Sequence, residues 1–261
     1  MTRPPELEGE ATNRAIQLAR IAGAPLYVVH VTCRDALEPI ARARAAGWRV
    51  TGETCTQYLF IDESYLERPD FEGAKYVYTP PARPQQHQEL LWRALMTDVL
   101  SVVSTDHCPF NWQGQKTLGR DDFSRIPNGG PGIEDRLNLL HHFGVGPGRI
   151  TMNRLVQLVS TNPAKVFGLY PRKGTIAVGS DADIVVFNPE RRLTLSAASH
   201  HSNVDYNLFE GMEVVGCPDV VLVRGQVIVQ DGELVAEPGA GRFVRRARVG
   251  EELPSSYAPV A

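Results

Sequence analysis

Residues 99–108 read VLSVVSTDHC, an aliphatic run that ends on side chains able to bind metals or move protons. A run that is apolar on both faces is typical of a strand buried in a parallel sheet. Asp106, His107 and Cys108 then lie at the carboxyl end of that strand, where parallel sheets and barrels gather their chemistry. The run therefore predicts an α/β sheet with functional groups along one edge.

The same pattern occurs twice upstream. Residues 25–32 (PLYVVHVT) and 48–55 (WRVTGETC) are rich in β-branched residues and are predicted strands. Helical spacing of apolar residues separates and flanks these strands over residues 6–22, 34–47 and 88–96. The alternation implies right-handed crossovers and a parallel sheet covered by helices. His30, at the end of the first strand, is expected at the same edge as Asp106.

The pattern of apolar and polar residues changes near Gly174. Residues 175–189 and 220–235 read as short alternating strands separated by turns, and Asp231-Gly232 is a strong hairpin signal. These features predict a small antiparallel β-sandwich. We therefore expect an α/β part over residues 1–172 and a sandwich with a C-terminal tail over residues 173–261.

Composition narrows the class of protein. With 261 residues and 43% hydrophobic residues, the chain is long enough to bury a sizeable core, and its net charge of -3 provides no basic surface for nucleic acid. Four cysteines without a CxxC pair fit a reducing cytoplasm. Since no apolar run approaches the ~20 residues of a spanning helix, we expect a cytoplasmic protein without a membrane partner.

Seven strings distributed over nearly the whole chain carry a family resemblance. They are VVHVTC (28–33), GETCTQYL (52–59), FEGAKYVYTPPAR (71–83), STDHCPF (104–110), GQKTLGRDDFSRIPNGGPGIEDR (114–136), KGTIAVGSDADIVVFNP (173–189) and DYNLFEGMEVVGCPDVVLVRG (205–225). Together they resemble the D-hydantoinase and dihydropyrimidinase family of the metal-dependent amidohydrolase superfamily. Several of the strings are long enough to make a chance similarity implausible.

The resemblance implies a (β/α)8 TIM barrel flanked by a β-sandwich, with two divalent metals, usually Zn²⁺, bridged by hydroxide and a carboxylated lysine. Residues 1–172 would then be the C-terminal part of the barrel, with about three of its strands. By resemblance, His30 is a metal ligand, and Asp106 is both a metal ligand and the proton shuttle. Thr79 and Asn128 resemble positions whose backbone groups hold the ureide.

The resemblance also implies a reaction and an assembly. Family members open a small cyclic ureide, a hydantoin or a dihydropyrimidine, to an N-carbamoyl amino acid, and they are usually homo-oligomers (tetramers or dimers). A metal can lower the pKa of bound water to about 7, so that hydroxide attacks the ring carbonyl. Asp106 would take the proton and pass it to the leaving ring nitrogen. His107 either lines the metal pocket or has no catalytic role, and Cys108 is expected to be a packed side chain.

The sequence also departs from the family. No His-x-His motif occurs in the 261 residues, and the bridging lysine has no counterpart. A whole barrel takes ~250 residues, so we expect the C-terminal half of an enzyme whose recorded start is an internal methionine or whose gene is incomplete. Two alternatives are a non-catalytic member that acts as a protein-interaction module, and one half of a split amidohydrolase. With two ligands only, the isolated chain is expected to show little or no hydrolysis.

Overall fold

The computed structural model describes residues 3–248. Contacts group the chain into two compact units, one formed by Met1–Leu140 with Thr194–Glu213 and the other by His141–Leu193 with Val214–Ala261. A grouping by contacts does not by itself define a domain boundary. The predicted division into residues 1–172 and 173–261 therefore stays a prediction, and the tail beyond residue 248 lies outside the described residues.

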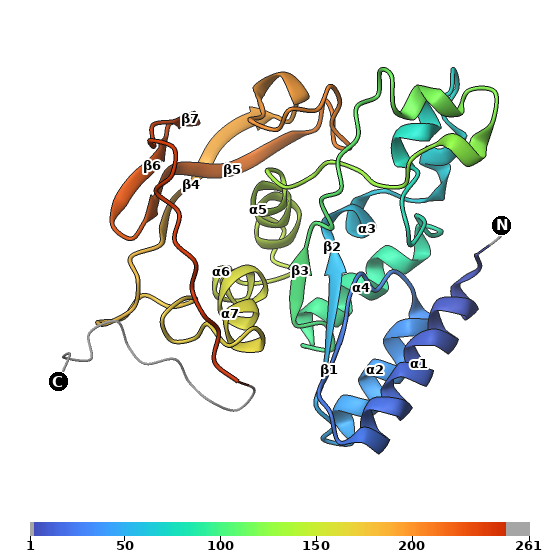
Figure 1. The fold of residues 1–261 in the computed structure, drawn as a ribbon, viewed down its shortest axis with the longest axis horizontal. Helices are drawn as coiled ribbons and strands as arrows, with labels where there is room; N and C mark the ends of the chain where they lie inside the picture. The colour runs from blue at the N-terminus through green and yellow to red at the C-terminus, as the bar shows by residue number, and fades with distance from the viewer. Residues whose placement is uncertain (1–2, 249–261) are drawn as a thin grey trace. The chain divides into compact units, whose positions relative to one another are not determined.

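The first unit contains a parallel sheet of three strands, as the sequence predicts (Figure 1). β1 (Leu26–Val28) pairs with β2 (Val50–Cys55), and β2 pairs with β3 (Val102–Ser104), so that β2 lies in the centre. In this register Val28 faces Gly52 and Cys55 faces Ser104. All three strands therefore end at the same edge of the sheet.

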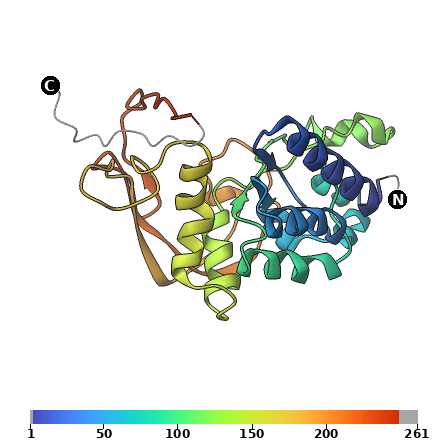
Figure 2. The same ribbon diagram turned by 90° about the horizontal axis from the view of Figure 1, so that it is seen from below.

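Three helices lie on one side of these strands (Figures 1 and 2). They are α1 (Pro5–Ala22), α2 (Arg34–Ala45) and α4 (Gln86–Met96). α1 begins with proline at its first position and ends at Gly23, whose φ of 65° closes the helix in the left-handed conformation that suits glycine. Ile16 of α1 and Ile40 of α2 are almost completely buried, which places the core of this unit between the helices and the sheet.

Short helical turns fill the long loops of the first unit. They are α3 (Thr56–Phe60), η1 (Glu63–Glu67), η2 (Glu72–Tyr76), η3 (Lys116–Gly119), η4 (Phe123–Arg125), α5 (Arg136–Leu140) and η7 (Ala197–Ser199). Most of them follow the carboxyl ends of β2 and β3 along the chain. The loops that carry the candidate site are therefore ordered by local turns rather than by a regular sheet.

The second unit begins with helices that are interrupted by wider turns. After the π-helical turn η5 (His141–Val145), α6 (Met152–Val156), the π-helical turn η6 (Gln157–Thr161) and α7 (Asn162–Val166) form one continuous run. Pro163 has no N–H, and its ring would clash with the carbonyl group four residues earlier, which accounts for the wider turn before it. Within residues 3–248, each helix is too short or too polar to cross a membrane.

A four-stranded sheet completes the second unit, with strand order β4-β5-β6-β7. The strands are β4 (Ile184–Thr194), β5 (Glu213–Val223), β6 (Gln226–Gln230) and β7 (Glu233–Leu234). β6 is antiparallel to both β5 and β7. Asp231 and Gly232, with φ of 54° and 92°, join β6 to β7 and confirm the predicted hairpin. Residues 175–183 form turns rather than the predicted start of a strand.

Candidate functional site

His30 and Asp106 both lie just beyond the carboxyl ends of parallel strands. His30 follows β1 by two residues, and Asp106 follows β3 by two residues. Since β2 separates these strands and neighbouring strands lie about 4.8 Å apart, the two positions are about 10 Å apart across the sheet. Both backbones are left-handed, with φ of 44° at His30 and 46° at Asp106. Two sharp turns therefore place the imidazole of His30 and the carboxylate of Asp106 at the same edge of the sheet.

A buried ion pair fixes the chain just after His30. The backbone N–H of Thr32 donates to Oε1 of Glu8 over 2.8 Å, and Nη2 of Arg83 donates to Oε2 of the same carboxylate over 2.9 Å. The side chains of Arg83 and Glu8 are only 5% and 14% exposed. Nε of Arg83 also donates to the Thr32 hydroxyl over 2.9 Å. The turn that carries His30 is thereby tied to α1 and to the segment after residue 80.

His107 and Cys108 join the Asp106 turn to a glycine-rich loop. The backbone N–H of Gly132 donates to Nδ1 of His107 over 3.2 Å, and the N–H of Cys108 donates to the carbonyl of Gly130 over 3.2 Å. Burial lowers the pKa of His107, which keeps Nδ1 available as an acceptor. The structure therefore gives His107 a role in holding this loop, and Cys108 is exposed rather than packed as the sequence suggested.

Thr79 and Asn128 come together from segments that are distant in the sequence. The hydroxyl of Thr79 donates to Oδ1 of Asn128 over 3.0 Å, and Nη1 of Arg3 donates to the same hydroxyl over 2.7 Å. Next to Asn128, Gly129 has a φ of 150°, and a Cβ there would lie 2.3 Å from the carbonyl oxygen of Cys108. Glycine is thus required for the close approach of this loop to the Asp106 segment.

One face of the sheet carries polar groups that the sequence analysis did not single out. The hydroxyl of Tyr27 donates to a carboxylate oxygen of Glu53, and Glu53 is only 9% exposed. Nη1 of Arg136 donates to the carbonyl of Val103 over 3.1 Å. Burial lowers the pKa of Arg136, while Glu53 opposes that shift. The signal was a glutamate inside the predicted strand over residues 48–55.

These residues supply only part of a metal site. An imidazole and a carboxylate are suitable ligands for Zn²⁺ and similar ions, but a catalytic zinc needs three protein ligands. Between residues 3 and 248, no three His, Cys, Asp or Glu side chains are grouped closely enough to hold an ion. His30 and Asp106 therefore fit as members of a larger ligand set, and these residues alone do not fit two metals.

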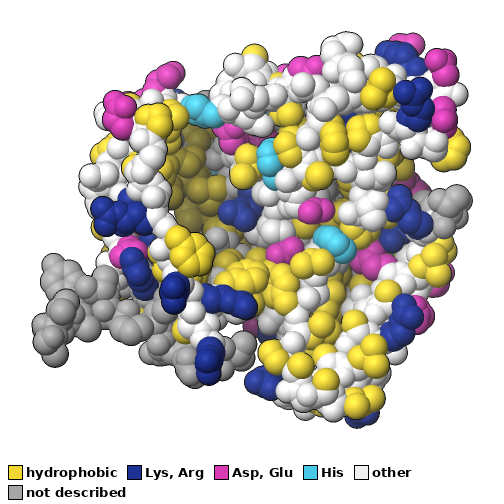
Figure 3. Space-filling view, in the orientation of Figure 1, with side chains coloured by type: hydrophobic (Ala, Val, Ile, Leu, Met, Phe, Trp, Pro, Cys, Tyr) yellow, Lys and Arg dark blue, Asp and Glu magenta, His cyan; other side chains and the backbone are white. Residues whose placement is uncertain are grey.

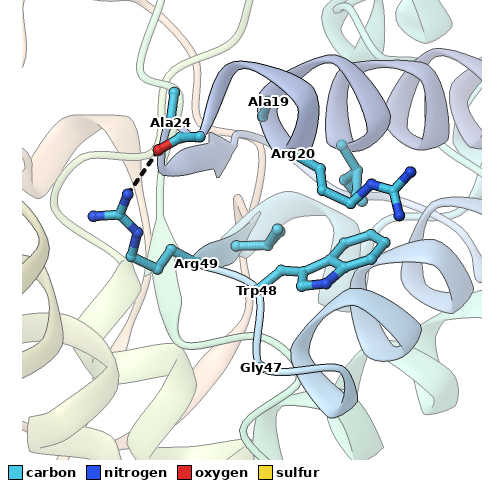
Figure 4. Close-up of a pocket in the computed structure, with 9 residues that line it drawn as sticks. Ala19, Arg20, Ala24, Gly47, Trp48 and Arg49 are labelled. Atoms are coloured by element: carbon cyan, nitrogen blue, oxygen red, sulfur yellow. Dashed lines mark hydrogen bonds between the residues drawn. The ribbon is translucent and has the colours of Figure 1, made fainter.

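A pocket of about 200 Å³ lies at the opposite end of the strands (Figure 4). It is lined by the turns that precede β1 and β2, where Nη2 of Arg49 donates to the carbonyl of Gly23 over 2.8 Å. The guanidinium of Arg20 lies 4.9 Å from the ring centre of Trp48. Because chemistry in parallel α/β folds gathers at the carboxyl ends of strands, this pocket is separate from the candidate site.

Comparison with known proteins decides the family. The model of the amidohydrolase family matches residues 13–228, which is most of the chain. The chain belongs to the amidohydrolase family. Membership of this family implies the use of a divalent metal.

Individual members of the amidohydrolase family are also similar to this chain. A D-hydantoinase of Geobacillus stearothermophilus is 58% identical over 250 residues, which are 96% of this chain and 53% of that protein. A dihydropyrimidinase of Arabidopsis thaliana is 45% identical over 258 residues, or 98% of this chain and 47% of that protein. The crystal structure of the dihydropyrimidinase from Brevibacillus agri NCHU1002 superimposes with a TM-score of 0.93 at 57% identity, covering 94% of this chain and 53% of that one.

These similarities confirm the family resemblance that the seven strings indicate. They also confirm the predicted fold class. This amidohydrolase chain is α/β, with three parallel strands and an added antiparallel sheet, and it spans about half the length of the relatives it matches. The roles of His30, Asp106, Thr79 and Asn128 are tested by none of these similarities and stay predictions. In the structure, His30 and Asp106 lie just beyond the carboxyl ends of β1 and β3. Thr79 and Asn128 lie on the long loops that follow β2 and β3 along the chain.

Proposed function

We propose that this chain carries part of the active site of a cyclic amidohydrolase, which opens hydantoins or dihydropyrimidines to N-carbamoyl amino acids. One observation carries the proposal: His30 and Asp106, in left-handed backbone conformations, follow strands that end at the same edge of a parallel sheet. The names of the similar D-hydantoinases and dihydropyrimidinases support the substrate class.

The Thr79 and Asn128 segments have the chemistry to hold a cyclic ureide. A ureide presents ring N–H donors beside C=O acceptors, and exposed backbone offers the complementary C=O and N–H groups. The bond between the Thr79 hydroxyl and the Asn128 side chain fixes these two segments side by side. They can therefore orient the ring so that one amide carbonyl faces the Asp106 edge.

Asp106 is proposed to move the proton. Its carboxylate is exposed on a fixed turn, so it can accept a proton from the attacking water and return it to the ring nitrogen as the C–N bond breaks. One carboxylate can thus act first as base and then as acid. His30 and Asp106 would also contribute to holding a divalent metal, which would polarise the carbonyl and activate the water.

Several finer features belong to the same proposal. We infer two Zn²⁺ ions in the complete site, a homo-oligomeric assembly (tetramer or dimer) and a cytoplasmic location. The family match supports the divalent metal. The choice between hydantoin and dihydropyrimidine rests on side chains that contact the ring substituent.

A direct assay tests the proposed reaction. Protein isolated from its own cells is incubated with hydantoin and with dihydrouracil, and products are identified by mass spectrometry. We expect N-carbamoylglycine or N-carbamoyl-β-alanine, formed at a rate that falls when a chelator is added. A metal-replete preparation that leaves both rings intact would contradict the proposal.

Exposed apolar residues favour a second candidate function, in which the chain is one half of a split amidohydrolase or an interaction module. Leu7, Leu18 and Ile21 of α1 are 56%, 61% and 78% exposed, and Figure 3 shows hydrophobic side chains at the surface in this region. Their helical positions place them on one stripe. Co-purification of a separately encoded chain that restores ring opening would support the split enzyme, and co-purification without activity would support the module.

A further inference from the structure

Lys116 is buried as completely as any side chain of the core. It opens the turn η3, and its exposed fraction is 0%. Lysine is almost never fully buried unless a partner compensates its charge. Within residues 3–248, no carboxylate pairs with Lys116, and the ring centre of Phe110 lies 6.0 Å from Nζ. The compensation must therefore come from neutral groups.

Two backbone carbonyls supply it. Nζ of Lys116 donates to the carbonyl of Val77 over 2.8 Å and to the carbonyl of Pro127 over 2.7 Å. Val77 lies two residues before Thr79, and Pro127 directly precedes Asn128. One buried ammonium thus bridges the two segments that carry the candidate ureide-binding residues.

The bridge is reinforced by a direct bond between the same segments. The backbone N–H of Gly129 donates to the carbonyl of Val77 over 3.1 Å, so that this carbonyl accepts from both Gly129 and Lys116. Burial lowers the pKa of Lys116 to about 8, which shows that the site disfavours the charge. A neutral core side chain would avoid that cost, so the cation has a use other than filling space.

We propose that Lys116 is a positioning residue for substrate, which sets the spacing of the Thr79 and Asn128 segments and polarises the Asn128 N–H. This inference rests on the proposed function. The carbonyl of Pro127 and the N–H of Asn128 belong to one peptide group. A cation bonded to that oxygen draws electron density away from the nitrogen, and chained hydrogen bonds of this kind strengthen one another by perhaps 10–30%.

The test compares KM and kcat of ring opening for Lys116→Met, Lys116→Gln and wild type. Each is assayed as the protein that its own cells produce. Methionine keeps the length and removes the donors, whereas glutamine keeps a neutral amide donor. We expect Lys116→Met to raise KM about tenfold, the effect of losing one hydrogen bond to substrate, while kcat changes less than threefold. Lys116→Gln should recover part of the loss. Lys75→Met, which removes a lysine that pairs with Glu72 instead, is the matched control.

A second readout needs no turnover. Amide hydrogen exchange in the 261-residue chain should become about tenfold faster over residues 128–130 in Lys116→Met and stay unchanged in β1 to β3. An unchanged KM with slow exchange at residues 128–130 would overturn the proposal, as would failure of both variants to fold, since the lysine would then serve stability alone. A wild-type protein that opens no ring would refute the proposed function, whereas the exchange result would still test the bridge.

Discussion

His30 and Asp106 keep their side chains at a conformational cost. A left-handed backbone costs a non-glycine residue about 1–2 kcal/mol, and glycine would avoid that cost, as Gly23 does at the end of α1 with a φ of 65°. Residues in such conformations cluster at active sites, where the surrounding structure holds them. The strain therefore agrees with an imidazole and a carboxylate that are retained for their chemistry.

Another residue pair makes stability depend on pH. Asp135 is fully buried, and Nε2 of His200 lies 2.9 Å from its Oδ1, while neither oxygen has a further hydrogen-bond partner within the described residues. The hydrogen bond to Asp135 raises the pKa of His200, and the charges of Glu134 and Glu210 act in the same direction. A raised pKa stabilises the fold below the unfolded value near 6.5, and this contribution is lost as pH rises through the folded value.

We therefore expect the stability gap between wild type and His200→Gln to shrink from pH 6 to pH 8. Urea unfolding at several pH values measures the gap, because wild type and variant expose nearly the same surface on unfolding. Asp135→Asn, which removes the charge that binds the imidazolium, should flatten the pH dependence as well. A gap that is constant or grows with pH would refute this linkage.

At the scale of elements, the loops rather than the strands position the candidate site. The sequence predicts a strand over residues 25–32, but β1 ends at Val28, because the chain turns at His30 and Thr32 bonds to Glu8. β-Branched residues signal extended backbone, but they do not reveal which residue leaves the sheet. The turn depends on Arg83, which is distant in sequence, and local pattern could not predict it.

Arg83→Met should destabilise the chain by about 3 kcal/mol. The reason is that Glu8 would stay buried without its cation, and breaking a buried pair costs far more than breaking a surface pair. Arg14→Met is the matched control, since Arg14 pairs with Glu10 on the exposed face of the same helix and should change stability by less than about 0.5 kcal/mol. Equal effects in urea unfolding would contradict the buried role of Arg83.

At the scale of the molecule, the sequence predicted the fold class and the edge of the sheet at which His30 and Asp106 lie. The alternation of strands and helices sufficed for the parallel arrangement, and the polar ends of two strands indicated His30 and Asp106. The contact between Thr79 and Asn128 and the buried bridge of Lys116 depend on long loops, whose course no periodicity records. Glu53 was missed because a charged side chain inside a strand usually signals only an exposed face.

The most direct test of the account is steady-state ring opening by Asp106→Asn, compared with wild type in protein of natural length. Asparagine keeps the size and the left-handed tendency of aspartate but cannot carry the proton, so we predict a loss in kcat of at least about 100-fold. Asp98→Asn, at another left-handed aspartate with a φ of 62°, serves as control and should leave kcat within twofold of wild type. An Asp106→Asn variant that opens the ring within a few-fold of the wild-type rate would contradict the assignment of the chemistry to this edge of the sheet.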